Sequence, residues 1–148
     1  MELLPIVREA KDRENLPDVE IRVQVPPGLT VCADGKLLTR AVSNLLRNAV
    51  RYAGKDGPIT VKAWSEKHET VVQVNDSGPG VAEEVLDRLF EPFYRPEPSR
   101  NRKSGGAGLG LAIVKTCVDA CQGSVAAKNT QPKGFEVSIR LPRKSEAN

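Results

Sequence analysis

Aromatic residues, cysteine and histidine are all scarce in this sequence. Phe, Trp and Tyr make up 4% of the 148 residues, so aromatic platforms for stacking single-stranded nucleic acid are not expected. The 22 basic and 19 acidic residues leave a net charge of +3, too small to indicate binding to nucleic acid or to a membrane surface. No run approaches the roughly 18 apolar residues of a membrane span, and no signal peptide opens the chain. The length and the 39% hydrophobic content predict one globular domain with a real core.

The three cysteines are too few and too irregularly spaced to predict a metal site. Cys117 and Cys121 are one helical turn apart, which is typical of buried packing residues in a reducing compartment. A metal or redox role for them is the alternative.

The stretch 104–115 is the most unusual part of the chain. It holds four glycines within six positions and then runs directly into an apolar helical pattern. Glycine allows backbone N–H groups to turn toward a ligand, and a helix start adds unpaired N–H groups with partial positive charge. This combination predicts a phosphate cradle, with a flexible loop before an ordinary helix as the alternative. The chain has no G-x-x-x-x-G-K-[ST] motif and no strand leading into the glycines, which argues against a P-loop or a dinucleotide fingerprint.

A long amphipathic helix is predicted after Asp34, which can cap it. Asn44 and Asn48 share one face of this helix, although asparagine is a poor helix former. Hydrogen bonding on the helix surface would explain them. An amide oxygen facing phosphates would instead be a plausible Mg²⁺ ligand.

The stretch 74–81 reads as a strand that ends in an acid followed by two glycines. A tight turn in which Asp76 bonds its own backbone would account for it. Under the functional interpretation, the glycines bring a flat ligand close and the Asp76 carboxylate accepts from an exocyclic amine. That pattern of acceptor and donor would select adenine over guanine.

The remaining pattern predicts a short opening helix, two hairpins and a terminal helix. Basic residues between positions 95 and 103 form either a solvated loop or a clamp on a terminal phosphate, within a polar segment that reads as a lid. The expected elements are a helix around Leu3–Ala10, strands at 19–25 and 31–33, a hairpin of 59–63 with 72–74, helices at 82–89 and 111–121, and a hairpin of 124–128 with 135–141.

Four motifs together resemble the ATP-binding catalytic domain of bacterial sensor histidine kinases, within the wider group that includes gyrase, Hsp90 and MutL. The resemblance covers about residues 15–142, and the order and spacing of the motifs make it specific. The motifs are Asn44-Leu45-Leu46-Arg47-Asn48-Ala49-Val50-Arg51-Tyr52, Asp76-Ser77-Gly78-Pro79-Gly80, Phe90-Glu91-Pro92-Phe93-Tyr94-Arg95 and Gly106-Ala107-Gly108-Leu109-Gly110-Leu111.

The resemblance implies an α/β fold of Bergerat type, a two-layer sandwich with a mixed sheet of about five strands backed by about three helices. It also implies ATP and Mg²⁺ as cofactors. Asp76 would recognise the adenine amine, and Gly80 would let the base approach the backbone. Asn48 would coordinate Mg²⁺, Asn44 would support the phosphates and Arg51 would neutralise them.

Further site residues follow from the same resemblance. Tyr52 would pack near the adenine, and Gly78 belongs to the same base-binding motif as Asp76. The glycine stretch would cradle the phosphates and form the hinge of the lid, through Gly106, Gly108, Leu109, Gly110 and Leu111. Arg95, with Arg100 or Arg102, would approach the γ-phosphate.

Position 44 separates hydrolysis from transfer within this group. Relatives that hydrolyse ATP carry a carboxylate base four residues before the metal asparagine, whereas Asn44 cannot take a proton. The chain is therefore expected to present the γ-phosphate to a histidine on a separate dimerisation domain, which in turn passes it to a response regulator. The alternatives are a serine kinase of the anti-sigma type and a nucleotide-binding module without transfer activity.

The phosphoacceptor motif of the family is absent, and His68, the sole histidine, falls in an expected hairpin turn. We therefore expect residues 1–14 to be the remnant of a linker helix, 15–142 the catalytic domain and 143–148 a polar tail. The domain is expected to be monomeric, to bind no nucleic acid, and to lie outside the membrane as the cytoplasmic portion of a sensor.

Overall fold

One sheet with helices on a single face makes up the structure. The computed structural model describes residues 1–14, 18–86, 88–91 and 107–143. Five strands lie in the order β1-β2-β3-β5-β4, with β1 and β2 parallel and the other neighbours antiparallel. The strands are β1 (Ile21–Gln24), β2 (Ile59–Glu66), β3 (Glu69–Asp76), β4 (Ser124–Asn129) and β5 (Phe135–Pro142).

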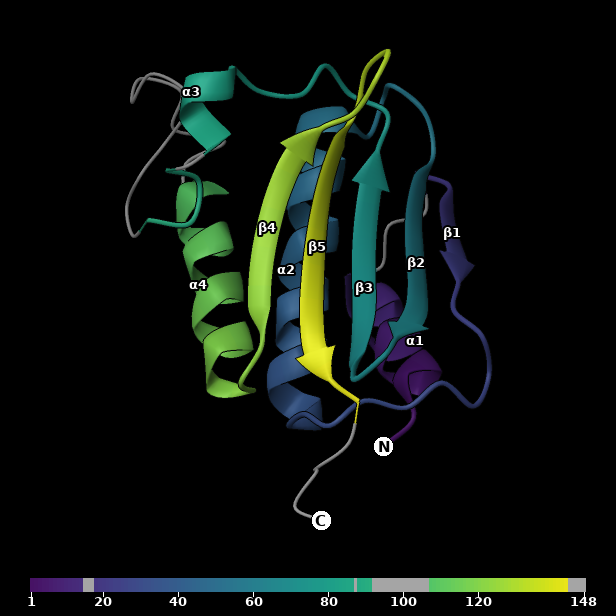
Figure 1. The fold of residues 1–148 in the computed structure, drawn as a ribbon. Coiled ribbons are helices and arrows are strands. Elements are labelled where there is room, and N and C mark those ends of the chain that lie inside the picture. Colours follow the sequence, from purple (N-terminus) through teal and green to yellow (C-terminus); the bar gives the residue numbers. More distant parts are fainter. Residues whose placement is uncertain (15–17, 87, 92–106, 144–148) are drawn as a thin grey trace.

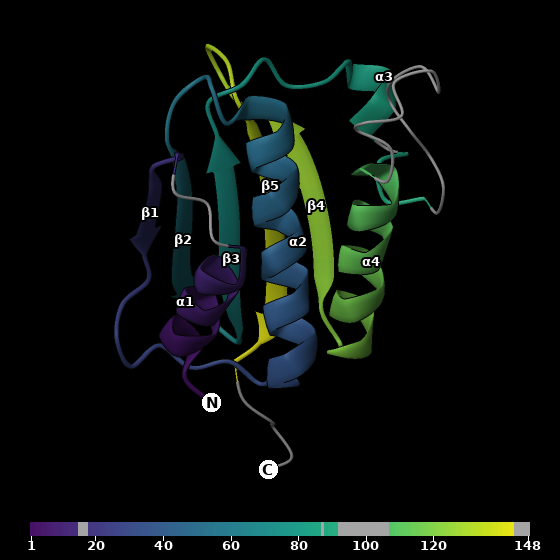
Figure 2. The ribbon, with the colours of Figure 1, turned by 180° about the vertical axis from the view of Figure 1, so that it is seen from behind.

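Three helices cover one face of this sheet, and no helix of the described residues lies on the opposite face (Figures 1 and 2). They are α1 (Leu3–Glu14), α2 (Gly35–Ala53) and α4 (Ala107–Ala120), while the four-residue α3 (Glu83–Leu86) lies beyond one end of β4. The predicted two-layer α/β sandwich and both predicted hairpins are confirmed.

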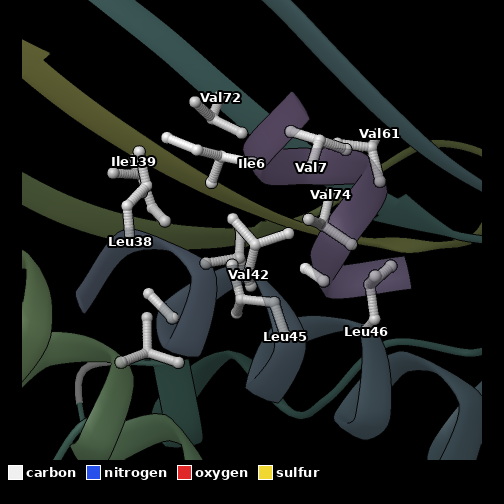
Figure 3. Close-up of a cluster of buried hydrophobic side chains, with 14 of the residues drawn as sticks. Ile6, Val7, Leu38, Val42, Leu45, Leu46, Val61, Val72, Val74 and Ile139 are labelled. Atoms are coloured by element: carbon white, nitrogen blue, oxygen red, sulfur yellow. The ribbon is translucent and has the colours of Figure 1, made fainter. Parts of the chain in front are cut away.

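Helix α2 is central because its apolar stripe packs on both the sheet and its neighbouring helices. Asp34 caps its start as predicted, with Oδ1 accepting from the backbone N–H groups of Lys36 and Leu37 at 2.9 and 3.1 Å. Figure 3 shows the core formed around this stripe. Its labelled members are Ile6, Val7, Leu38, Val42, Leu45, Leu46, Val61, Val72, Val74 and Ile139.

Helix α1 belongs to this same core. Leu3, Ile6, Val7 and Ala10 are buried, and the helix packs on α2. The helix that we expected to be a linker remnant is thus a structural part of the domain here, and its continuation into a linker stays a prediction.

The end of α1 is clamped to α2 by one carboxylate. Glu14 accepts a bidentate pair from Arg47, Nε to Oε1 and Nη2 to Oε2, both at 3.0 Å, and a short bond from the Ser43 hydroxyl. Burial opposes ionisation of Glu14, but the bonds from Arg47 and Ser43 outweigh it and lower the pKa of the carboxyl.

Two local predictions are wrong. Residues 31–33 are not a strand: their N–H groups go elsewhere, Val31 to the Met1 carbonyl and Cys32 to that of Pro142, each within 2.9 Å. Helix α4 begins at Ala107 rather than at Leu111, so two glycines that we took for loop lie in its first turn. Glycine costs about 1 kcal/mol in a helix interior, and this weak local preference is overridden by the packing of α4 on α2.

Candidate functional site

A cavity of about 370 Å³ opens where the ends of α2, β3 and β5 meet. This volume is typical of a small-molecule site, and the walls are mainly aliphatic with few polar groups. The lining residues are Leu45, Asn48, Ala49, Tyr52, Ala53, Val74, Asp76, Gly78, Pro79, Gly80, Val81, Ala82, Val85, Leu89, Leu111, Phe135 and Val137.

Asp76 is the carboxylate of this cavity. It is the last residue of β3, and its Oδ1 accepts from the Gly78 N–H at 2.9 Å. Both interpretations of the motif are therefore compatible, because the turn uses one lone pair and the carboxylate has others. Burial raises the pKa of Asp76, helped by the nearby Asp56 and opposed by backbone N–H bonds from Gly78 and Phe135.

This raised pKa predicts opposite pH trends for stability and for binding. The folded protein holds the Asp76 proton more tightly than the unfolded chain, so this contribution to stability is present below the unfolded pKa. It is lost as the pH rises through the folded pKa. The affinity for an adenine base should instead rise over that interval, because only the ionised carboxylate is a pure acceptor. Calorimetric titration and denaturant unfolding across the titration of Asp76, above the ordinary value of 3.8, measure the two trends. Parallel trends would contradict this assignment.

Asn48 reaches the same cavity from α2. Its Nδ2 is buried without a hydrogen-bond partner among the described residues. An unsatisfied buried amide is costly in a protein interior, which indicates that a polar ligand completes this site. The two ends of an amide are assigned from the hydrogen-bond network, so a ligand can meet either the oxygen or the nitrogen.

Asn44 lies on the same helix face but is not a lining residue. Its amide is already used: Nδ2 donates to the Arg40 carbonyl at 2.8 Å, and Oδ1 accepts from Arg47 Nη1 at 3.2 Å. Tyr52 lines the cavity, whereas Arg51 is exposed and lies outside the lining. The structure thus brings Asn48, Tyr52 and Asp76 together and leaves Asn44 and Arg51 beside them.

The two glycines of the Asp76 motif are required by the protein's own packing. A Cβ on Gly78 would lie 2.6 Å from that of Ala53 on α2. Gly80 has φ +80°, and its Cβ would lie 2.3 Å from Asn129 Oδ1. These contacts place the backbone of the motif directly on the cavity wall, and the approach of a base to Gly80 stays a prediction.

The predicted phosphate cradle lies at the start of α4. Gly108, Leu109 and Gly110 are in its first turn, where backbone N–H groups have no intrahelical partner, and Leu111 lines the cavity. Gly106 and the arginines predicted to reach the γ-phosphate, Arg95, Arg100 and Arg102, lie outside the described residues.

His68 is remote from the cavity. It lies in the β2–β3 turn, at the opposite end of β3 from Asp76, and a strand of eight residues spans about 26 Å. The Arg143 N–H donates to its carbonyl at 2.9 Å. His68 of the same molecule therefore does not reach the site.

Sequence reasoning missed much of the wall opposite α2. Phe135, Val137 and Leu89 line the cavity, and Asn129 holds part of the wall in place. The apolar residues have no sequence signal of their own, because their pattern is that of any core strand or helix. Asn129 has no local signal either, because its partner Val81 lies 48 residues away along the chain.

Residues 33–145 match the family described as histidine kinase-, DNA gyrase B-, and HSP90-like ATPase, and the chain belongs to this family. In the part of the chain that the structure describes, no helix is both long and apolar enough to cross a membrane.

The most informative relatives are sensor kinases. The chain is 34% identical over 146 residues to the signal transduction histidine-protein kinase BaeS of Escherichia coli (strain K12), covering 96% of this chain and 31% of BaeS. It is 45% identical over 112 residues to the sensor histidine kinase CusS of the same strain, covering 76% of this chain and 23% of CusS. The solved structure of a mycobacterial sensor histidine kinase, MprB, superposes with a TM-score of 0.83 at 30% identity, covering 96% of both chains. The chain thus spans less than a third of the length of these two curated relatives.

Proposed function

We propose that this domain binds Mg-ATP and presents the γ-phosphate to a histidine on a separate dimerisation domain of a sensor kinase. The observation that carries the proposal is Asp76, a half-buried carboxylate at the wall of a mainly apolar cavity. An aliphatic slot with one carboxylate suits a flat base that carries an exocyclic amine. In a full-length sensor the phosphoryl group would continue to a response regulator, and the domain would act on the cytoplasmic side of a membrane.

The donor set also fits Mg²⁺ carried in by the nucleotide. Among the described residues no three His, Cys, Asp or Glu side chains lie close enough to form a metal site. Mg²⁺ commonly keeps several waters and takes ligands from substrate phosphates, so it needs few protein ligands. Asn48 would supply an amide oxygen, and the metal would neutralise charge on the phosphates. The first turn of α4 would supply backbone N–H groups to the same phosphates.

The environment of Asn44 supports transfer over hydrolysis. Its amide oxygen accepts from a guanidinium and its nitrogen donates to a helix carbonyl. A neutral amide held in this way cannot take a proton from an attacking water. Slow hydrolysis would preserve ATP in the site until the acceptor histidine arrives.

A phosphotransfer assay tests the proposal. The chain is incubated with γ-labelled Mg-ATP and a separately expressed dimerisation domain from a sensor kinase of this family. We expect acid-labile label on the dimerisation domain and little on the chain itself, equally so for the His68→Ala variant, because His68 is remote from the cavity.

The same assay separates the alternatives. Acid-stable label on a serine substrate would favour the anti-sigma type of kinase. Acid-labile label on the chain itself that is lost in the His68→Ala variant would overturn the proposal. Tight ATP binding without transfer to any acceptor would leave a nucleotide-binding module.

A further inference from the structure

One side chain outside the four motifs bonds to the wall of the cavity as a strand would. Asn129 is the last residue of β4, and its amide meets both backbone groups of Val81. Oδ1 accepts from the Val81 N–H at 2.9 Å, and Nδ2 donates to the Val81 carbonyl at 2.7 Å. Two residues that face each other in an antiparallel sheet exchange the same pair of hydrogen bonds, one N–H to carbonyl bond in each direction.

The segment that Asn129 holds has no strand to support it. β3 ends at Asp76, and the chain then runs through Gly78–Ala82 along the cavity before α3 begins. Backbone groups that are partly shielded from water need partners, and here a side-chain amide supplies those of Val81. Nδ2 also lies 3.2 Å from Oε2 of Glu83, so the same amide reaches the start of α3.

Close packing fixes the distance between this amide and the wall. Gly80 presses on Asn129 so tightly that a Cβ would lie 2.3 Å from Oδ1. On the other side, the β4–β5 turn brings Phe135 into register with Asp76, and a Cβ on Gly134 would lie 2.8 Å from the Asp76 carbonyl oxygen. The β4–β5 hairpin therefore touches both the backbone of Asp76 and the facing wall.

We propose that Asn129 is a positioning residue for the adenine subsite, which holds the Gly80–Ala82 part of the cavity wall in the position that admits a flat base. The proposal rests on the proposed function, since it assigns the aliphatic part of the cavity to the base. It acts on the base and not on the phosphates, because the partners of the Asn129 amide among the described residues are Val81 of the wall and Glu83 of α3.

The test compares the affinities of Asn129→Ala for adenosine, ADP and ATP, measured by calorimetry at a temperature where circular dichroism shows the variant folded. Loss of the two part-buried hydrogen bonds should weaken the binding of all three ligands by one common factor of about ten. The ratio of ATP affinities with and without Mg²⁺ should stay at its wild-type value. A merely structural role would lower the unfolding midpoint and leave the affinity of the folded protein unchanged.

Two further variants sharpen the result. Asn129→Asp keeps the shape of the side chain but sets an oxygen against the Val81 carbonyl. Its affinity should fall by the same factor of about ten, and this variant tests the proposal where Asn129→Ala folds poorly. Asn75→Ala is the matched control: its amide bonds to Gln73 Oε1 at 2.8 Å, away from the cavity, and its affinities should stay within about twofold of wild type.

The outcomes separate the two proposals. If the wild type binds adenine nucleotides and both Asn129→Ala and Asn129→Asp bind them with the same affinity, the positioning role alone is overturned. A loss confined to ATP in the presence of Mg²⁺ would overturn it too, since the phosphates would then be the affected part. No binding of any adenine nucleotide by the wild type would remove the proposed function and this inference with it.

Discussion

Asp76→Asn should weaken ATP binding by about 10- to 150-fold, with little change in the free energy of unfolding at neutral pH. The carboxylate is expected to accept from the adenine amine, and hydrogen bonds to charged groups contribute about 1.5–3 kcal/mol. Asparagine keeps an oxygen for the Gly78 N–H, so the turn that Asp76 closes is retained. Its NH₂ group, however, replaces an acceptor by a donor. Removing a carboxylate whose burial is costly also offsets any loss of contacts within the fold.

Asp56→Asn is the matched control for this variant. It makes the same change of net charge, and Asp56 is close enough to raise the pKa of Asp76 yet is exposed and outside the cavity lining. Its ATP affinity should stay within about twofold of wild type, because exposed charges interact weakly. Equal losses of ATP affinity in the two variants would show that the negative charge of the acidic groups matters and that the hydrogen bond from the adenine amine to Asp76 does not. Unchanged binding in Asp76→Asn would remove the basis of the proposed function.

Asn48→Ala should reduce the rate of phosphotransfer by about 100-fold or more, without lowering stability. Loss of one preorganised group that stabilises charge at a reacting phosphate typically costs 10²–10³ in rate, as an order of magnitude. The dependence of ATP affinity on Mg²⁺ should also disappear. Most truncations of partly buried residues destabilise a protein, but here the removed amide carries a buried nitrogen without a partner among the described residues. Its loss removes a desolvation cost that the folded protein bears.

Phosphotransfer assays and denaturant unfolding check both halves of this prediction, with Asn75→Ala as the control for the change of residue type. A variant that is destabilised but transfers phosphate normally would contradict it. In that case Asn48 would be a structural residue whose partner lies elsewhere.

Most of the fold could be predicted because local patterns and packing agree in it. A few neighbouring residues are enough to predict the apolar stripe of α2, the Asp34 cap and the hairpin between Glu66 and Glu69. The structure confirms all three. The strand predicted at 31–33 was wrong because a run of three apolar residues does not show which backbone, if any, will pair with it. The predicted start of α4 was wrong because the low helix propensity of glycine is a small effect compared with the packing of a whole helix.

The site was predictable where one residue carries the chemistry, and less so where several elements combine. Asp76 and Asn48 could be identified from a carboxylate before glycines and from an amide on an apolar helix, and both line the cavity. Asn44 shows the limit of spacing arguments, because the same helix face that places it near Asn48 also places Arg40 and Arg47 in reach of its amide. Asn129 is 48 residues from Val81 along the chain, and no local pattern connects them.

The three thiols differ in exposure, so the domain can be labelled at a single cysteine. Cys32 is exposed, whereas Cys117 and Cys121 are buried and burial raises the pKa of Cys117, which keeps that thiol unreactive. The Cys32 backbone bonds to Pro142, at the end of β5 opposite Phe135 and the cavity. A maleimide carrying biotin or a dye should therefore modify one position, and molecules tethered there to a sensor chip would all present the nucleotide opening to the flowing solution.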